Sequence, residues 1–212
     1  MRNFVYRQIP NLITLARLAL TVVFFVLLNT HEKSTFVWHM QIAFMVFLVA
    51  VLTDILDGYL ARKWKVESAF GRVVDPFVDK ILICGAFIFF SSDDFINVAE
   101  QLFSQDIIKA GRITGVHPWM AVVIIAREFL VTSIRGLAES RGIDFRSDWA
   151  GKIKMFVQSI AVAAVILDLA VISKVPWIHV LRDVAIWTTV VVTVLSATTY
   201  VVRARKVLIE RA

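Results

Sequence analysis

Residues 53–80 read TDILDGYLARKWKVESAFGRVVDPFVDK, and this stretch organises the chain. It places two pairs of carboxylates, Asp54 with Asp57 and Asp75 with Asp79, beside or inside strongly apolar segments. The spacings of three and four residues put the members of each pair on one face of a helix. Two helices that each present two carboxylates supply the oxygen ligands that hard divalent cations prefer. Four negative charges near lipid are very costly without cations, so the stretch predicts a metal site.

Composition predicts an integral membrane protein. Of the 212 residues 58% are apolar, and the mean hydropathy is +0.75, whereas about half of the residues of a soluble domain are apolar. The apolar residues fall in runs of roughly 18 to 25, the length that crosses a bilayer. We expect one all-α membrane domain over residues 1–212, with a short interfacial helix in residues 1–10 followed by six transmembrane helices. The spans are expected at about 12–28, 36–59, 73–90, 118–137, 153–172 and 177–201.

Charge predicts how the chain lies in the membrane. The net charge of +6 suggests nucleic acid at first, but the basic residues concentrate at both ends and in the connections 61–72 and 139–149. An excess of Lys and Arg marks the cytoplasmic side of a membrane protein. We therefore expect a bacterial-type cytoplasmic (inner) membrane protein with both termini and the active site cytoplasmic, and no nucleic-acid partner. The single Cys84 excludes an internal disulfide and a cysteine-based zinc site.

Three local features need a separate interpretation, and two of them leave alternatives open. Arg17 lies about one turn inside the first span, where it either snorkels to the membrane surface or takes part in the site. Pro76 lacks an amide hydrogen, so the third helix either begins near Asp75 or bends there. The polar segment 91–116 is interpreted as an external loop with an amphipathic turn or two lying on the membrane.

The two Asp pairs also belong to a recognisable signature. Its fixed positions are Asp54-x2-Asp57-Gly58-x2-Ala61-Arg62-x8-Gly71-x3-Asp75-x3-Asp79. This pattern resembles the signature of the CDP-alcohol phosphotransferase family. Members of that family are integral membrane enzymes that transfer a phosphatidyl or similar group from a CDP-linked donor to an alcohol and release CMP. The resemblance implies that all four Asp hold two Mg²⁺ or Mn²⁺ ions and that Asp79 also acts as general base. It implies CDP contacts from the residues between the pairs, Gly58, Ala61, Arg62, Ser68 and Gly71.

Further stretches resemble one branch of that family, the phosphatidylglycerophosphate synthases. They are IPNLITLARL at 9–18, GRVVDPFVDK at 71–80, AREFLVTSIRGLAESRG at 126–142 and GKIKMFVQ at 151–158. The acceptor implied is sn-glycerol 3-phosphate, whose phosphate is expected to meet Arg127, Arg135, Lys152 and Lys154. Simpler roles stay open for these residues: Arg127 pairs only with Glu128 or a motif Asp, and the two lysines only set the topology. Gln158 is a lesser candidate for a hydroxyl contact.

We therefore expect an enzyme that transfers the phosphatidyl group of CDP-diacylglycerol to sn-glycerol 3-phosphate, working as a homodimer among membrane lipids. One alternative keeps the chemistry and changes the acceptor, as in a cardiolipin synthase of the CDP-alcohol type or an inositol phosphate or serine transferase. A distant alternative is a cation channel or transporter that uses the Asp cluster as its pathway. Such a protein has no need for the spacing of Gly58, Ala61, Arg62 and Gly71.

Overall fold

The computed structural model describes the backbone of residues 2–29, 32, 34–64, 69–93, 97, 113–141, 149–171 and 176–209. Within these helices the side chains of residues 2–11, 55–73, 75, 149–150, 152, 176 and 206–209 are not described. Six long helices occupy the described part of the chain, and no strand occurs in it. They are α1 (Arg2–Leu28), α2 (Phe36–Trp64), α3 (Ala69–Ser91), α6 (Pro118–Ser140), α7 (Trp149–Val171) and α8 (Pro176–Ile209). The prediction of an all-helical fold is confirmed for these residues.

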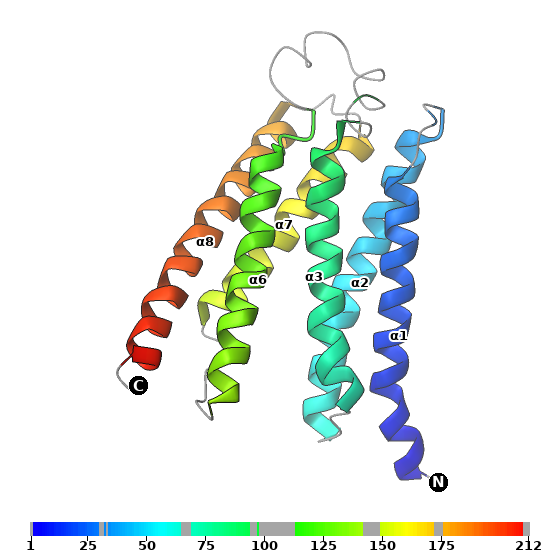
Figure 1. Ribbon diagram of the computed structural model, residues 1–212. Helices are drawn as coiled ribbons and strands as arrows, with labels where there is room; N and C mark the ends of the chain where they lie inside the picture. The colour runs from blue at the N-terminus through cyan, green and yellow to red at the C-terminus, as the bar shows by residue number, and fades with distance from the viewer. Residues whose placement is uncertain are drawn as a thin grey trace.

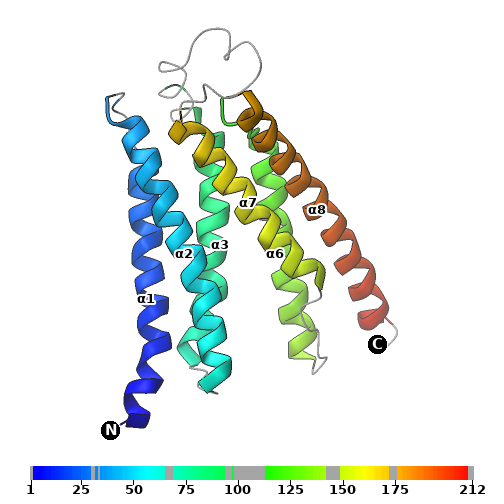
Figure 2. The same ribbon diagram turned by 180° about the vertical axis from the view of Figure 1, so that it is seen from behind.

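The helices stand side by side as a bundle with α1 at one edge and α8 at the other (Figure 1). Helix α1 packs on α2 and α3, α7 packs on α2 and α8, and α6 packs on α3 and α8. Seen from behind, α7 runs obliquely across the bundle (Figure 2). Both ends of the chain lie at the same end of the bundle, which agrees with an even number of crossings.

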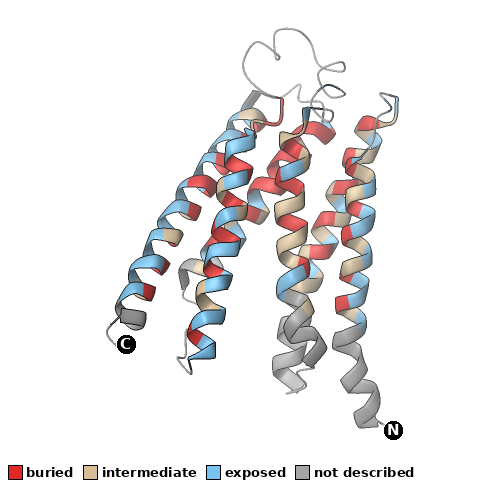
Figure 3. Cartoon of the chain, viewed as in Figure 1, coloured by how far each residue is buried: buried red, intermediate tan, exposed pale blue. Residues whose placement is uncertain are grey.

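The core of the bundle is apolar and lies between the helices. Its largest fully buried side chains include Phe24, Phe47, Phe87 and Ile124. Gly85 allows α1 to approach α3, because a Cβ at this position would collide with the ring of Phe25. Many of the exposed residues, which are pale blue in Figure 3, lie on the outward faces of the helices. Large apolar side chains are common among them. An apolar exterior around an apolar core suits a bundle that lipid surrounds.

Three of the helices are long and apolar enough to cross a membrane: Phe36–Asp54, Ile153–Val171 and Trp177–Arg205. Leu12–Leu28 forms a shorter apolar helix. In the described residues, α3 and α6 do not reach this standard, although each has 23 residues. Each of them contains charged residues, such as Lys80 in α3 and Arg127 in α6. The count of six spans therefore stays a prediction.

Two local expectations differ from the structure. Residues 2–10 do not form a separate helix, because α1 continues from Arg2 to Leu28 without a break. Helix α3 begins at Ala69, so Pro76 lies in its interior and the alternative start near Asp75 is wrong. Most of the predicted external segment 91–116 lies outside the described residues, so its interpretation as a loop is not tested.

Candidate active site

A buried arginine joins the two Asp-bearing helices. Arg17 of α1 is 1% exposed, and its Nη1 lies 2.7 Å from Oδ1 of Asp54 and 3.2 Å from Oδ1 of Asp79. The two carboxylates come from α2 and α3, yet both contact the same nitrogen. One Asp from each pair therefore converges on a common point, as the metal-site prediction requires.

This geometry decides between the two interpretations of Arg17. A snorkelling arginine keeps its guanidinium in water, whereas this guanidinium is enclosed by α1, α2 and α3. Arg17 therefore belongs to the site. Hydrogen bonds to ionised groups are the stronger kind, and a single guanidinium offers five donors in a fixed plane. It ties α1 to α2 and α3 through Asp54 and Asp79.

The rest of the predicted donor site falls largely on side chains that are not described. They are those of Asp57, Gly58, Ala61, Arg62, Gly71 and Asp75, together with Ser68, which lies wholly outside the described residues. Among the residues that the structure describes, no group of three or more His, Cys, Asp or Glu forms a metal cluster. Of the four Asp predicted to bind metal, Asp54 and Asp79 have described side chains. The metal assignment therefore depends on Asp54 and Asp79 in the structure and on the signature for the others.

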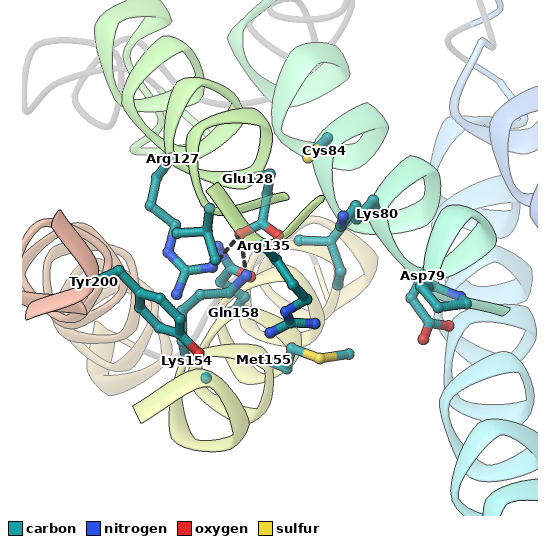
Figure 4. A pocket seen from close by; sticks show the side chains of 14 residues that line it. Asp79, Lys80, Cys84, Arg127, Glu128, Arg135, Lys154, Met155, Gln158 and Tyr200 are labelled. Atoms are coloured by element: carbon teal, nitrogen blue, oxygen red, sulfur yellow. Dashed lines mark hydrogen bonds and ion pairs between the residues drawn. The ribbon is translucent and has the colours of Figure 1, made fainter. Parts of the chain in front are cut away.

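A pocket of about 280 Å³ begins at Asp79 and extends between α3, α6, α7 and α8. Its polar lining consists of Asp79, Lys80, Arg127, Glu128, Arg135, Lys154, Gln158 and Tyr200, with Cys84 and apolar side chains between them. Figure 4 places Asp79 on one side of this pocket and Tyr200 with Arg127 on the other. The carboxylate site and a basic pocket are thus neighbours that share Asp79.

Arg127 is held in the pocket wall by three neighbours. Its Nη1 donates to Oε1 of Glu128 at 3.2 Å, and its Nε donates to Oγ of Ser196 at 3.1 Å. The ring of Tyr200 lies 5.5 Å from the guanidinium carbon, within the range of a cation–π contact. Lys154 also donates to Oε1 of Glu128. Arg127 and Lys154 are therefore brought together by one carboxylate.

Several donors around the pocket have no partner in the described structure. They are Nη2 of Arg127, Nε of Arg135 and Nε2 of Gln158, each of them buried. Buried polar groups are nearly always hydrogen-bonded, so unsatisfied donors at a cavity indicate a ligand that accepts hydrogen bonds. Two cationic side chains and one amide with donors left over favour an oxyanion.

The structure thus brings together some of the residues that the sequence predicts to bind the acceptor. Arg127, Arg135 and Lys154 all line the pocket, and Gln158 lies with them. The side chain of Lys152 is outside the described set. The open alternative for Arg127, a pair with Glu128, is also found, but that pair lies in the pocket wall and leaves Nη2 available.

Sequence reasoning missed two supports of the pocket, Ser196 and Tyr200 of α8. Ser196 contacts an arginine 69 residues earlier in the chain, and no spacing rule connects positions that far apart. A weak signal existed for Tyr200, a lone aromatic close to the basic end of the last apolar segment.

A second buried charged cluster lies away from the pocket. Asp168 of α7, which is 2% exposed, accepts from Nη1 of Arg182 at 2.7 Å and lies 3.0 Å from Nδ1 of His179. Arg182 also donates to the carbonyl oxygen of Ile113. Asp168 follows Lys154 by 14 positions, a rise of about 21 Å along a helix. This cluster fastens residues 113–116 to α7 and α8 and has no contact with the site.

Comparison with known proteins identifies the family. A family model described as CDP-alcohol phosphatidyltransferase matches residues 7–195. The chain belongs to this family. The match includes both Asp pairs, Arg17 and the basic side chains of the pocket.

Similar CDP-alcohol phosphatidyltransferases are found in several bacteria. A CDP-diacylglycerol–glycerol-3-phosphate 3-phosphatidyltransferase of Bacillus subtilis (strain 168) is 34% identical over 202 residues, which cover 91% of this chain and 93% of that protein. A probable phosphatidylglycerophosphate synthase of Mycobacterium tuberculosis (strain H37Rv) is 32% identical over 200 residues, covering 93% and 81%. A CDP-diacylglycerol–glycerol-3-phosphate 3-phosphatidyltransferase of Pectobacterium atrosepticum is 32% identical over 165 residues, covering 75% and 76%.

Proposed function

We propose that this CDP-alcohol phosphatidyltransferase moves the phosphatidyl group of CDP-diacylglycerol to sn-glycerol 3-phosphate, giving phosphatidylglycerophosphate and CMP. One observation carries the choice of acceptor: a pocket lined by Arg127, Arg135 and Lys154 opens beside the carboxylate of Asp79. Three cations suit an acceptor that carries a phosphate and fit less well with an uncharged alcohol. The names of the Bacillus subtilis and Pectobacterium relatives support the same donor and acceptor.

The donor half of the site is proposed to hold two Mg²⁺ or Mn²⁺ ions through Asp54, Asp57, Asp75 and Asp79. The convergence of Asp54 and Asp79 on one positively charged nitrogen fits this assignment, because it demonstrates a position where carboxylate oxygens from two helices meet a cation. Bound divalent ions would neutralise the diphosphate of the donor and stabilise the negative charge of the departing CMP. Arg62 and Ser68 would contact the CDP moiety, and Gly58, Ala61 and Gly71 would let it approach the backbone.

The acceptor half is proposed to act by orientation and proton removal. Arg127, Arg135 and Lys154 would bind the phosphate of the acceptor, with Lys152 as a further contact. The hydroxyl at the other end of the acceptor would then have to reach Asp79, which lines the same pocket. As general base, Asp79 would accept the hydroxyl proton while the oxygen attacks the phosphorus of the donor. Holding both reactants in this way supplies much of the catalysis in such a transfer.

The membrane arrangement is part of the proposal. Residues 1–212 form one domain with six spans in a bacterial-type inner membrane, and both termini face the cytoplasm. The shared position of the termini at one end of the bundle supports an even number of crossings. The carboxylates would then meet soluble acceptor and metal from the cytoplasm, while the lipid donor enters from the bilayer. We also propose a homodimer formed through the spans.

The test is the release of CMP by purified protein in detergent with CDP-diacylglycerol and Mg²⁺ or Mn²⁺. We expect release only when sn-glycerol 3-phosphate is added. Inositol phosphate, serine and phosphatidylglycerol, offered in parallel, identify the alternative transferases. If an alternative acceptor alone supports release, the proposed acceptor is wrong. Metal flux in liposomes without nucleotide would instead support the transporter.

A further inference from the structure

Cations outnumber carboxylates around the acceptor pocket. The cationic lining residues that the structure describes are Lys80, Arg127, Arg135 and Lys154, and the anionic ones are Asp79 and Glu128. Asp79 pairs with Arg17, which comes from α1 and does not line the pocket. Glu128 contacts two of the cations of the pocket, Arg127 and Lys154.

Glu128 is placed to compensate two cations at once. Its Oε1 accepts from Nη1 of Arg127 at 3.2 Å and from Nζ of Lys154. All three side chains are buried, with exposed fractions of 6%, 8% and 3% for Arg127, Glu128 and Lys154. Figure 4 shows Glu128 in the pocket wall with dashed contacts running from it to these neighbours. A single negative charge therefore faces two positive charges in a site with little water.

This arrangement has a direct consequence for any anion that enters. Glu128 takes one donor from Arg127 and one from Lys154, and a phosphate bound beside it would draw on the same two positive charges, so the carboxylate and the ligand compete for Arg127 and Lys154. The ligand also experiences repulsion from the charge of Glu128, which is strong in a buried site. A dianion attracts the surrounding cations strongly enough to overcome that repulsion. A monoanion gains about half the attraction and is not strongly favoured over the internal carboxylate.

We propose that Glu128 sets the charge that the acceptor must carry: it competes for Arg127 and Lys154, so that a doubly charged phosphate monoester binds and a singly charged phosphodiester is rejected. This inference rests on the proposed function, because it takes the pocket to be the acceptor site. It assigns Glu128 a role in specificity that the phosphate-binding residues do not have. Glu128 provides specificity because it repels a ligand that carries only one negative charge.

The first experiment compares wild-type protein with Glu128→Gln, which retains the shape and the acceptor oxygen and removes the charge. We expect the KM for sn-glycerol 3-phosphate to fall about three- to tenfold, with kcat changing less and the KM for CDP-diacylglycerol unchanged. Dimethyl phosphate, a monoanion, should inhibit the variant competitively and leave the wild type unaffected. Glu139→Gln, on an exposed position of α6 outside the pocket, is the matched control. An unchanged or raised acceptor KM in Glu128→Gln overturns the proposal.

The second experiment needs neither turnover nor a variant. Binding to wild-type protein is measured from the rise in melting temperature with methyl phosphate, mainly a dianion at pH 8 because its second pKa is about 6, and with dimethyl phosphate. We expect methyl phosphate to bind at least about tenfold more tightly, and equal binding overturns the inference. If CMP release does not depend on sn-glycerol 3-phosphate, the proposed function fails, while this measurement still decides whether the pocket prefers a dianion, and dimethyl phosphate binding to Glu128→Gln and to the wild type decides the role of Glu128.

Discussion

Removal of Arg17 tests whether the carboxylate site is built around a buried positive charge. Arg17→Met retains most of the length of the side chain and removes the cation that Asp54 and Asp79 both contact. Removing one partner of a buried ion pair costs about 3–5 kcal/mol, because the remaining charge stays buried. The side chains of Asp54 and Asp79 are 35% and 19% exposed, so water lessens the penalty, and we expect about 3 kcal/mol.

The assay is thermal unfolding of the purified protein in detergent, with EDTA or with excess Mg²⁺. A loss of about 3 kcal/mol corresponds to a decrease in Tm of about 6–12 °C for a chain of this size. We expect that decrease in EDTA and a clear recovery with Mg²⁺, since a divalent ion supplies the missing positive charge. Arg205→Met is the control, because Arg205 is exposed on α8 and its loss should change Tm little.

Two results would refute this reasoning. If Arg17→Met and Arg205→Met have the same Tm in EDTA, the buried ion pair contributes nothing to the stability of the bundle. If Mg²⁺ does not stabilise Arg17→Met at all, the metal does not bind at the carboxylates that Arg17 contacts. The second result would also remove the structural support for the proposed metal ligands.

Further predictions concern the base, the pocket and the second charged cluster. Asp79→Asn should abolish CMP release while retaining binding of at least one Mn²⁺, measured by calorimetry; a near-normal rate would exclude Asp79 as the base. Arg135→Gln should raise the KM for sn-glycerol 3-phosphate by about tenfold or more with little change in Tm, because its Nε is buried without a partner; an unaltered KM in steady-state kinetics would place the phosphate elsewhere. Asp168→Asn should lower the stability by about 2 kcal/mol, because it removes the buried carboxylate that pairs with Arg182 and leaves the more exposed Asp183 as its partner, and should leave both KM values unchanged; a changed KM would mean that this cluster and the pocket are coupled.

Several properties of the site were predictable because they depend on neighbouring positions along the chain. The pairing of Asp54 with Asp57 and of Asp75 with Asp79 follows from helical spacing alone, and apolar runs predict the helices that carry them. The family signature adds roles to the same positions. Arginines inside an apolar segment, such as Arg127 and Arg135, likewise indicate an anionic partner, because a charge at that depth is costly unless it is paired.

What the sequence could not decide is which side chains meet across the bundle. Arg17 and Asp79 are 62 positions apart, and Glu128 and Lys154 are 26 apart. Such contacts depend on how each helix is rotated about its axis and where it crosses its neighbours, and many rotations bury a similar apolar area. The sequence therefore determined the helices, the carboxylate spacing and the family. Only the packing of the helices decided that Arg17 bridges the Asp pairs and that Glu128 contacts both Arg127 and Lys154.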